Sequence, residues 1–304
     1  MKALLLLIPA LAGCDLDDAE VSQAIESHTT ATLQTEVVYE SEELAFDGAG
    51  NLVAKKGELL IAVPPHGPSH YVSRDPALAT LSLGLRFLPD GDLVVAQPAV
   101  EEGLVARLLR VAPDGSVTNF FTAADMPAGL PPFIIPNALA VEPSGGVFVS
   151  DFATSQILHV APDRSVIPVV VGAEAASVGG AAYDARHRLL YYTSGNTVRR
   201  VAVDVAGHPT GAPAVFATLP DTRLDGIVLD RDGNAYVVDS DPSVPRFALW
   251  RVGGDTATTR RVATFDDWVS GAQFGAGPGY DDRSIYVSSI TGKVFRVRTG
   301  VRGM

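Results

Sequence analysis

The chain alternates short apolar runs with turns rich in Gly, Pro and Asp. In residues 135–151, IPNALAVEPSGGVFVSD, two apolar runs flank the turn Pro-Ser-Gly-Gly. This pattern predicts a β-hairpin. Because the two strands of a hairpin run antiparallel, Asn137 and Asp151 are expected at the same end of it.

The same pattern recurs along the chain. Each unit has a short strand, a turn, a more apolar strand, and a longer segment with one or two further strands. The units begin 41 to 54 residues apart, at Glu42, Leu83, Asn137, Gly179, Asp225 and Ser270. A repeat of this length with four strands is typical of a propeller blade. The sequence therefore predicts an all-β fold, a six-bladed β-propeller over residues 31–304.

The sequence also indicates how the ring closes. The last unit ends after its third strand, KVFRVRTGV, whereas polar and apolar residues alternate over residues 30–40. We expect this N-terminal segment to supply the missing outer strand. Such pairing of the two chain ends would also protect the edge of the last blade.

The first residues have the composition of an export signal. Residues 1–13 contain one Lys, an apolar run and Leu-Ala-Gly, followed by Cys14, the only cysteine of the chain. This stretch resembles a bacterial lipoprotein signal, and an ordinary secretion signal is the alternative. We expect Cys14 to be lipidated, residues 14–30 to form a polar tether, and the protein to be anchored to a membrane of the bacterial cell envelope, on its periplasmic or extracellular side.

Charge excludes one class of partner. The formal net charge is −12, with 35 acidic and 23 basic residues. Such a surface repels phosphates, so no nucleic-acid partner is expected. We expect a monomer that acts on a small molecule.

We expect a functional site where the six units begin. The innermost strand of a blade lines the central channel, so its first residue lies at the channel mouth. Four of the six first residues carry side-chain oxygen, and two of these are carboxylates, Glu42 and Asp225. Oxygen ligands suit hard cations. Alternatively, Asn137 and Asp225 only shape the turns that enter the strands.

These residues resemble the senescence-marker-protein/gluconolactonase family, six-bladed propellers that hydrolyse lactones with one divalent metal. The resemblance rests on Glu42 in SEELAFD, Asn137 in PNALAV and Asp225 in LDGIVLD, together with the hairpin AAYDARHRLLYYTS. It implies that Glu42, Asn137 and Asp225 hold one divalent cation. Ca²⁺ is the first expectation, with Mg²⁺, Mn²⁺ or Zn²⁺ as alternatives. Asp225 would also be the catalytic base, and Asn137 would contact substrate oxygen.

One position departs from the family pattern. The family has an Asn at the start of the fourth blade, where this chain has Gly179. Water could replace the missing ligand. Alternatively the metal site has been lost, and the protein is a non-catalytic, lipid-anchored propeller that binds a ligand or a protein partner at the cell envelope.

Further residues are expected near the mouth. Asp151 and Asp239 each lie 14 residues after a predicted ligand, and we expect them to contact substrate or to orient the ligands. The loop of residues 123–136 could form an apolar pocket wall or pack against the core. His66 and His70 lie between the first two units and are more typical of the surface. A lyase on the same scaffold would need a histidine at the mouth.

Overall fold

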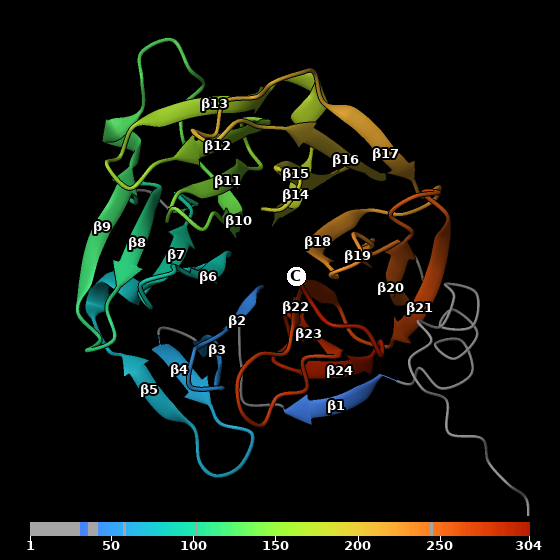
Figure 1. Ribbon diagram of the computed structural model, residues 1–304. Helices are drawn as coiled ribbons and strands as arrows, with labels where there is room; N and C mark the ends of the chain where they lie inside the picture. Colours follow the sequence, from blue (N-terminus) through green and yellow to red (C-terminus); the bar gives the residue numbers. More distant parts are fainter. Residues whose placement is uncertain (1–30, 36–41, 57–58, 101–102, 244–245) are drawn as a thin grey trace, which may run out of the picture.

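The computed structural model describes residues 31–35, 42–56, 59–100, 103–243 and 246–304. Within these ranges the strands form six four-stranded antiparallel sheets around a central axis (Figure 1). The predicted six-bladed β-propeller is confirmed. The described residues contain three short 3₁₀ turns and no α-helix: η1 (Pro76–Leu78), η2 (Ala123–Asp125) and η3 (Ala173–Ala175). No helix among them is long and apolar enough to cross a membrane.

The first three blades run in chain order from the inner to the outer strand. Blade 1 has β2 (Leu44–Phe46), β3 (Leu52–Lys56), β4 (Leu59–Val63) and β5 (His70–Ser73). Blade 2 has β6 (Leu85–Phe87), β7 (Leu93–Gln97), β8 (Arg107–Val111) and β9 (Val117–Thr122). Blade 3 has β10 (Pro136–Val141), β11 (Val147–Asp151), β12 (Gln156–Val160) and β13 (Val166–Val171).

The next two blades follow the same order, and the last one differs. Blade 4 has β14 (Val178–Asp184), β15 (Leu189–Ser194), β16 (Thr197–Ala202) and β17 (Ala214–Thr218). Blade 5 has β18 (Leu224–Leu229), β19 (Ala235–Asp239), β20 (Phe247–Val252) and β21 (Thr259–Phe265). Blade 6 has β22 (Val269–Phe274), β23 (Ser284–Ser289), β24 (Val294–Arg298) and, as its outer strand, β1 (Thr32–Thr35).

The outer strand of blade 6 comes from the N-terminal side of the chain. β1 pairs antiparallel with β24, with Thr32 opposite Arg296 and Leu33 opposite Phe295 (Figure 1). The two ends of the propeller sequence thus meet in one sheet. The proposed signal and tether, residues 1–30, lie outside the described residues.

The inner strands begin close to the predicted positions. β2 and β6 begin two residues after Glu42 and Leu83, and the other four inner strands begin one residue before the predicted position. In blade 3, Pro136 lies opposite Asp151, so Asn137 and Asp151 do lie at the same end of their hairpin. All six first positions therefore lie on one face of the ring.

Hydrophobic packing joins each blade to the next. The buried residues form six clusters, and each cluster contains residues from two neighbouring blades. At the junction of blades 6 and 1, Phe46 packs against Tyr280 and Tyr286 with ring centroids 4.9 and 5.2 Å apart. The Tyr280 hydroxyl donates to the Val63 carbonyl oxygen at 2.8 Å. The core is thus a ring of interfaces between blades.

Near the axis the inner strands approach so closely that side chains are excluded. The residue after the first position is Gly or Ala in five blades: Gly84, Ala138, Gly180, Gly226 and Gly271. A Cβ atom on Gly226 would lie 2.6 Å from the carbonyl oxygen of Ser270 in the next blade. A Cβ atom on Gly180 would overlap the Asp225 carbonyl oxygen and lie 2.7 Å from the Ile227 nitrogen. Only a hydrogen atom fits at Gly180 and Gly226.

We expect Gly180→Ala to destabilise the protein by about 1–3 kcal/mol, because the new methyl group meets backbone atoms that cannot rotate away. Gly211→Ala is the matched control, since a Cβ atom there has no neighbour within 4 Å. Urea unfolding of both variants would test this. Equal stability of the two variants would contradict the close-packing account.

Candidate functional site

A cavity of about 140 Å³ opens at the face where the inner strands begin. It is lined by eleven residues: Glu42, Leu83, Ile135, Asn137, Phe152, Ser177, Gly179, Arg223, Leu224, Asp225 and Ser240. Five of the six predicted first positions are among them. The sixth, Ser270, is not in the lining, and its hydroxyl donates to the Glu42 carbonyl oxygen at 2.8 Å.

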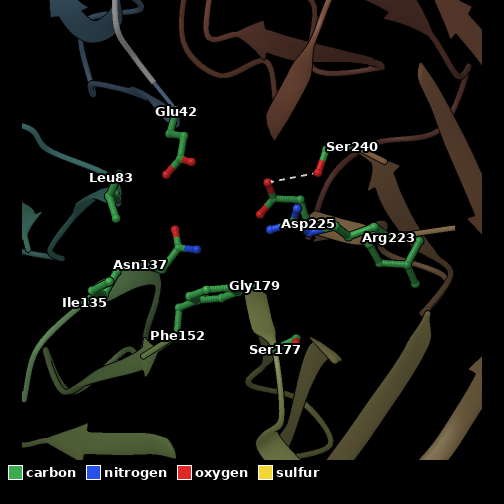
Figure 2. A pocket seen from close by; sticks show the side chains of 11 residues that line it. Glu42, Leu83, Ile135, Asn137, Phe152, Ser177, Gly179, Arg223, Asp225 and Ser240 are labelled. Carbon is green, nitrogen blue, oxygen red and sulfur yellow. Dashed lines mark hydrogen bonds between the residues drawn. The ribbon is translucent and has the colours of Figure 1, made fainter. Parts of the chain in front are cut away.

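The side chains of Glu42, Asn137 and Asp225 point into this cavity from blades 1, 3 and 5 (Figure 2). Glu42 and Asp225 are 183 residues apart in the sequence, and the closed ring of blades brings all three residues together. Ser240 donates to Oδ2 of Asp225 at 3.3 Å. The structure therefore gathers three oxygen-bearing side chains at one mouth of the channel.

Glu42 is electrostatically strained. Its Oε2 atom is buried and has no hydrogen-bond partner among the described residues. Burial, and after it the nearby carboxylates of Asp225 and Glu43, raise the pKa of Glu42 to about 8, whereas Arg223 acts in the opposite direction. A buried carboxylate without a partner is costly, and a bound cation would remove that cost.

Asp225 is in a similar position. Burial raises its pKa above the ordinary value, while the Ser240 hydrogen bond and the charge of Arg223 oppose the rise. Arg223 is exposed at the cavity mouth, and its guanidinium has no hydrogen bond or ion pair within the described residues. This arginine is the cationic group whose charge lowers the pKa of both acids, and sequence reasoning missed it.

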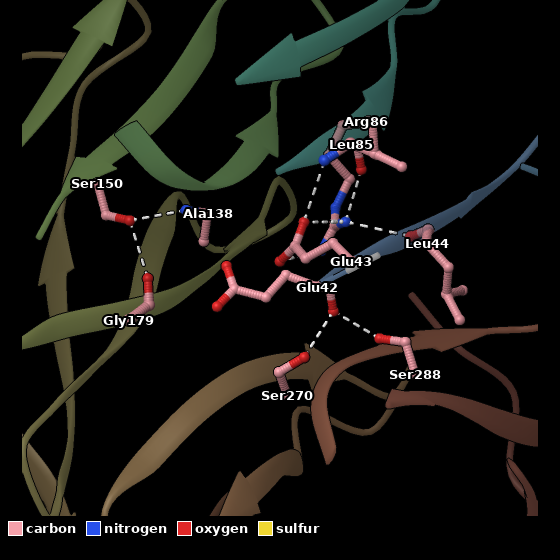
Figure 3. A network of polar contacts seen from close by, with 10 residues as sticks. All are labelled: Glu42, Glu43, Leu44, Leu85, Arg86, Ala138, Ser150, Gly179, Ser270 and Ser288. Carbon is pink, nitrogen blue, oxygen red and sulfur yellow. Dashed lines mark hydrogen bonds and ion pairs between the residues drawn. The ribbon is translucent and has the colours of Figure 1, made fainter. Parts of the chain in front are cut away.

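A third acid lies behind the cavity. Glu43 is 6% exposed, and its carboxylate accepts hydrogen bonds from Arg86 at 2.8 Å and from the Leu85 amide at 3.3 Å (Figure 3). Burial raises the pKa of Glu43 to about 7, opposed by Arg86 and by the Leu85 amide. Unlike Glu42, Glu43 has a cationic partner, so its charge needs no metal ion to stabilise it. It still adds to the negative potential of the site.

Hydroxyl groups on the second strands hold the backbone of the site. Ser150 accepts from the Ala138 amide and donates to the Gly179 carbonyl oxygen at 2.8 Å, and Thr193 donates to the Asp225 carbonyl oxygen at 2.9 Å. Ser288 donates to the Glu42 carbonyl oxygen at 2.6 Å (Figure 3). Each of the three bonds to a carbonyl oxygen crosses from one blade to the first position of the next. The hydroxyl near the end of the second strand in blades 3, 4 and 6 was the available sequence signal.

Asp151 and Asp239, which we expected to contact substrate, do not line the cavity. Asp151 accepts from the amides of Ile134 and Ile135 at 2.6 and 3.1 Å, and Asp239 accepts from the Arg223 amide at 3.1 Å. Both carboxylates thus hold the loop that enters the inner strand of their own blade. These contacts favour the orienting role that the sequence left open.

The loop of residues 123–136 both lines the cavity and packs against the core, the two roles expected for it. Ile135 lines the cavity, whereas Phe133 is buried in the core against Phe121, with ring centroids 5.1 Å apart. His66 and His70 are exposed and lie outside the lining. No histidine in the described part of the chain lines the cavity, so the site offers no base of the kind a lyase would need.

Gly179 leaves room for the Asp225 carboxylate. A Cβ atom at this position would lie 3.1 Å from Oδ1 of Asp225 and 3.1 Å from Oγ1 of Thr193. These contacts are tighter than ordinary packing. An Asn at this position would therefore have to displace Asp225 by a few tenths of an ångström.

No family model and no curated protein sequence match the chain. Solved structures do match. A gluconolactonase from Xanthomonas campestris has a TM-score of 0.69 at 16% identity, covering 88% of this chain and 89% of its own. A calcium-binding regucalcin from Agrobacterium tumefaciens has a TM-score of 0.69 at 17% identity, covering 90% and 95%. The chain shares its fold with the gluconolactonase-like propellers.

Other solved structures are also similar. A virginiamycin B lyase from Staphylococcus aureus has a TM-score of 0.60 at 12% identity, covering 84% of this chain and 79% of its own. At these identities the likeness concerns the fold, and the chemistry has to be argued from the side chains at the mouth.

The raised pKa of Glu42 predicts how stability depends on pH. In cation-free protein, the contribution of Glu42 to folding stability is fully present below its ordinary pKa of 4.5. This contribution is lost as the pH rises through about 8. Glu42→Gln should therefore stabilise the protein by at least about 1 kcal/mol at pH 8.5 and change little at pH 5. Thermal unfolding in EDTA at both pH values would measure this. A destabilised variant at pH 8.5 would show that Glu42 has a partner in solution.

Proposed function

We propose that this protein is a metal-dependent hydrolase of a lactone or a related ester, with its site at the channel mouth. The observation that carries the proposal is the convergence of Glu42, Asn137 and Asp225 in one cavity, with Oε2 of Glu42 buried and without a partner among the described residues. The gluconolactonase-like fold supports the proposal, as does the calcium-binding neighbour.

The residues present fit a hard divalent cation. Two carboxylates and one carboxamide supply oxygen donors, the type that Ca²⁺ prefers, with Mg²⁺ and Mn²⁺ next. In the described part of the chain no three His, Cys, Asp or Glu side chains gather as a metal-binding cluster. The site therefore depends on Asn137 as its third protein ligand. Water or substrate would complete the coordination, as is usual for Ca²⁺ and Mg²⁺.

The bound cation would act as a Lewis acid on the substrate carbonyl. Asp225, whose pKa is raised, takes a proton from the attacking water as the new C–O bond forms. It returns that proton to the ring oxygen as the lactone C–O bond breaks. Ser240 holds the Asp225 carboxylate by its hydrogen bond. Arg223 at the mouth neutralises the carboxylate of the ring-opened product.

Gly179 favours a second candidate function. With no side chain at this position, the mouth lacks the carboxamide that the resemblance to the family implies there, and its carboxylate and carboxamide donors are those of Glu42, Asn137 and Asp225. A non-catalytic, lipid-anchored propeller that binds a ligand or a protein partner at the cell envelope would need no fourth donor. Cation binding separates the two functions, because only the hydrolase requires it.

Asp225→Asn and Glu42→Gln should each weaken Ca²⁺ binding by roughly 10²-fold, because each removes one carboxylate from a partly buried cation site. Both variants should also lose lactone turnover. Calorimetry with Ca²⁺, Mg²⁺ and Mn²⁺, beside a lactone screen, would measure the two effects. Asp163→Asn is the matched control, since this acid caps an exposed turn away from the cavity. A wild-type protein that binds no cation and opens no lactone would favour the binding propeller.

We also propose that Cys14 is lipidated and anchors the protein to a membrane of the bacterial cell envelope. The proposal rests on the sequence of residues 1–14, which lie outside the described residues. Cys14→Ser should move the protein from the membrane fraction to the soluble fraction, because the acyl chains are lost. Fractionation of cells expressing both forms would test this. Equal membrane association of the two forms would reject the anchor.

A further inference from the structure

The cavity has two chemically different sides. Glu42, Asp225, Ser240 and Arg223 form the polar side, on blades 1 and 5. Leu83, Ile135 and Phe152 come from blades 2 and 3 (Figure 2). The first position of blade 2 is thus an aliphatic residue within a ring of otherwise polar or small residues. None of these three side chains can form a hydrogen bond, so they constitute an apolar wall.

The apolar wall is fixed in place by backbone hydrogen bonds. The Phe152 amide donates to the Ile135 carbonyl oxygen at 2.9 Å, and the Leu83 amide donates to the Ala96 carbonyl oxygen at 3.0 Å. Asp151 accepts from the Ile135 amide at 3.1 Å. Because hydrogen bonds hold the backbone of all three residues, the wall is preorganised to distinguish between ligands.

A wall of this composition favours contact with alkyl groups over contact with hydroxyl groups. A polyhydroxylated ring placed in this cavity would lose water from the hydroxyl groups that face Leu83, Ile135 and Phe152, because Asn137 is the one polar side chain that blades 2 and 3 contribute to the lining, and that loss is costly. An alkyl substituent would instead leave water for an apolar contact. The cavity volume of about 140 Å³ is below the roughly 300–1,000 Å³ typical of sites for drug-sized ligands. It suits one small ring with a short side chain.

We propose that the substrate is a small lactone with a short alkyl substituent, and that Leu83, Ile135 and Phe152 determine this specificity. The inference rests on the proposed hydrolase function and names its substrate class. The ring carbonyl faces Glu42, Asn137 and Asp225, and the alkyl group lies against the apolar wall. Polyhydroxylated sugar lactones are poor substrates.

The test compares two substrate classes on the same full-length protein with saturating Ca²⁺. The probes are γ-valerolactone and γ-hexalactone on one side and D-glucono-1,5-lactone on the other. We expect the wild type to favour the alkyl lactones at least tenfold in kcat/KM. Leu83→Asn and Phe152→Asn should each lower kcat/KM for alkyl lactones by roughly 10- to 10²-fold and leave the value for the sugar lactone level or higher. Two variants are used so that one misfolded protein does not decide the result.

Val205→Asn is the matched control, because this valine is 79% exposed and lies outside the cavity. Its kcat/KM values should equal those of the wild type. The specificity inference would be overturned if the wild type preferred the sugar lactone, or if folded wall variants lowered kcat/KM equally for both lactone classes. Either result would leave the hydrolase function intact. If the folded, Ca²⁺-loaded protein turned over no lactone, that result would instead overturn the hydrolase function itself.

Discussion

The close approach of the inner strands at the propeller axis is the constraint on which the rest of the structure depends. Backbone carbonyl groups of one blade lie against the backbone of the next, so Gly or Ala occupies the second position of five blades. This packing draws the first positions of all six blades onto a small ring. A cavity narrow enough for Glu42, Asn137 and Asp225 to face one another follows directly from it.

The same ring sets the electrostatics of the site. Hydroxyl groups of Ser150, Thr193 and Ser288 bind the carbonyl oxygens of Gly179, Asp225 and Glu42, so the backbone that carries the site has little freedom to move. The two carboxylates therefore cannot separate to relieve their repulsion. Burial raises the pKa of both acids, and the Asp225 carboxylate adds to the rise for Glu42. Stability is given up at neutral pH to keep two acids buried in one cavity, a trade common at functional sites.

The two acids of blade 1 show how neighbouring residues acquire different roles. Glu43 is buried but has Arg86 as a partner, and it ties blade 1 to blade 2. Glu42 points into the cavity, and its Oε2 has no partner among the described residues. Successive side chains of an extended chain point in opposite directions, so one residue serves the interface and the other serves the site.

The sequence by itself determined the blade number, the inner-strand starts and the positions of Glu42, Asn137 and Asp225, because hydrophobic periodicity and turn residues are local signals. The placement of Arg223 and Phe152 in the cavity lining was decided only by the tertiary structure. So was the finding that Asp151 and Asp239 bind backbone amides instead of lining the cavity. Whether a side chain faces a cavity or a neighbouring backbone depends on how residues distant in the chain pack, and no local pattern records that.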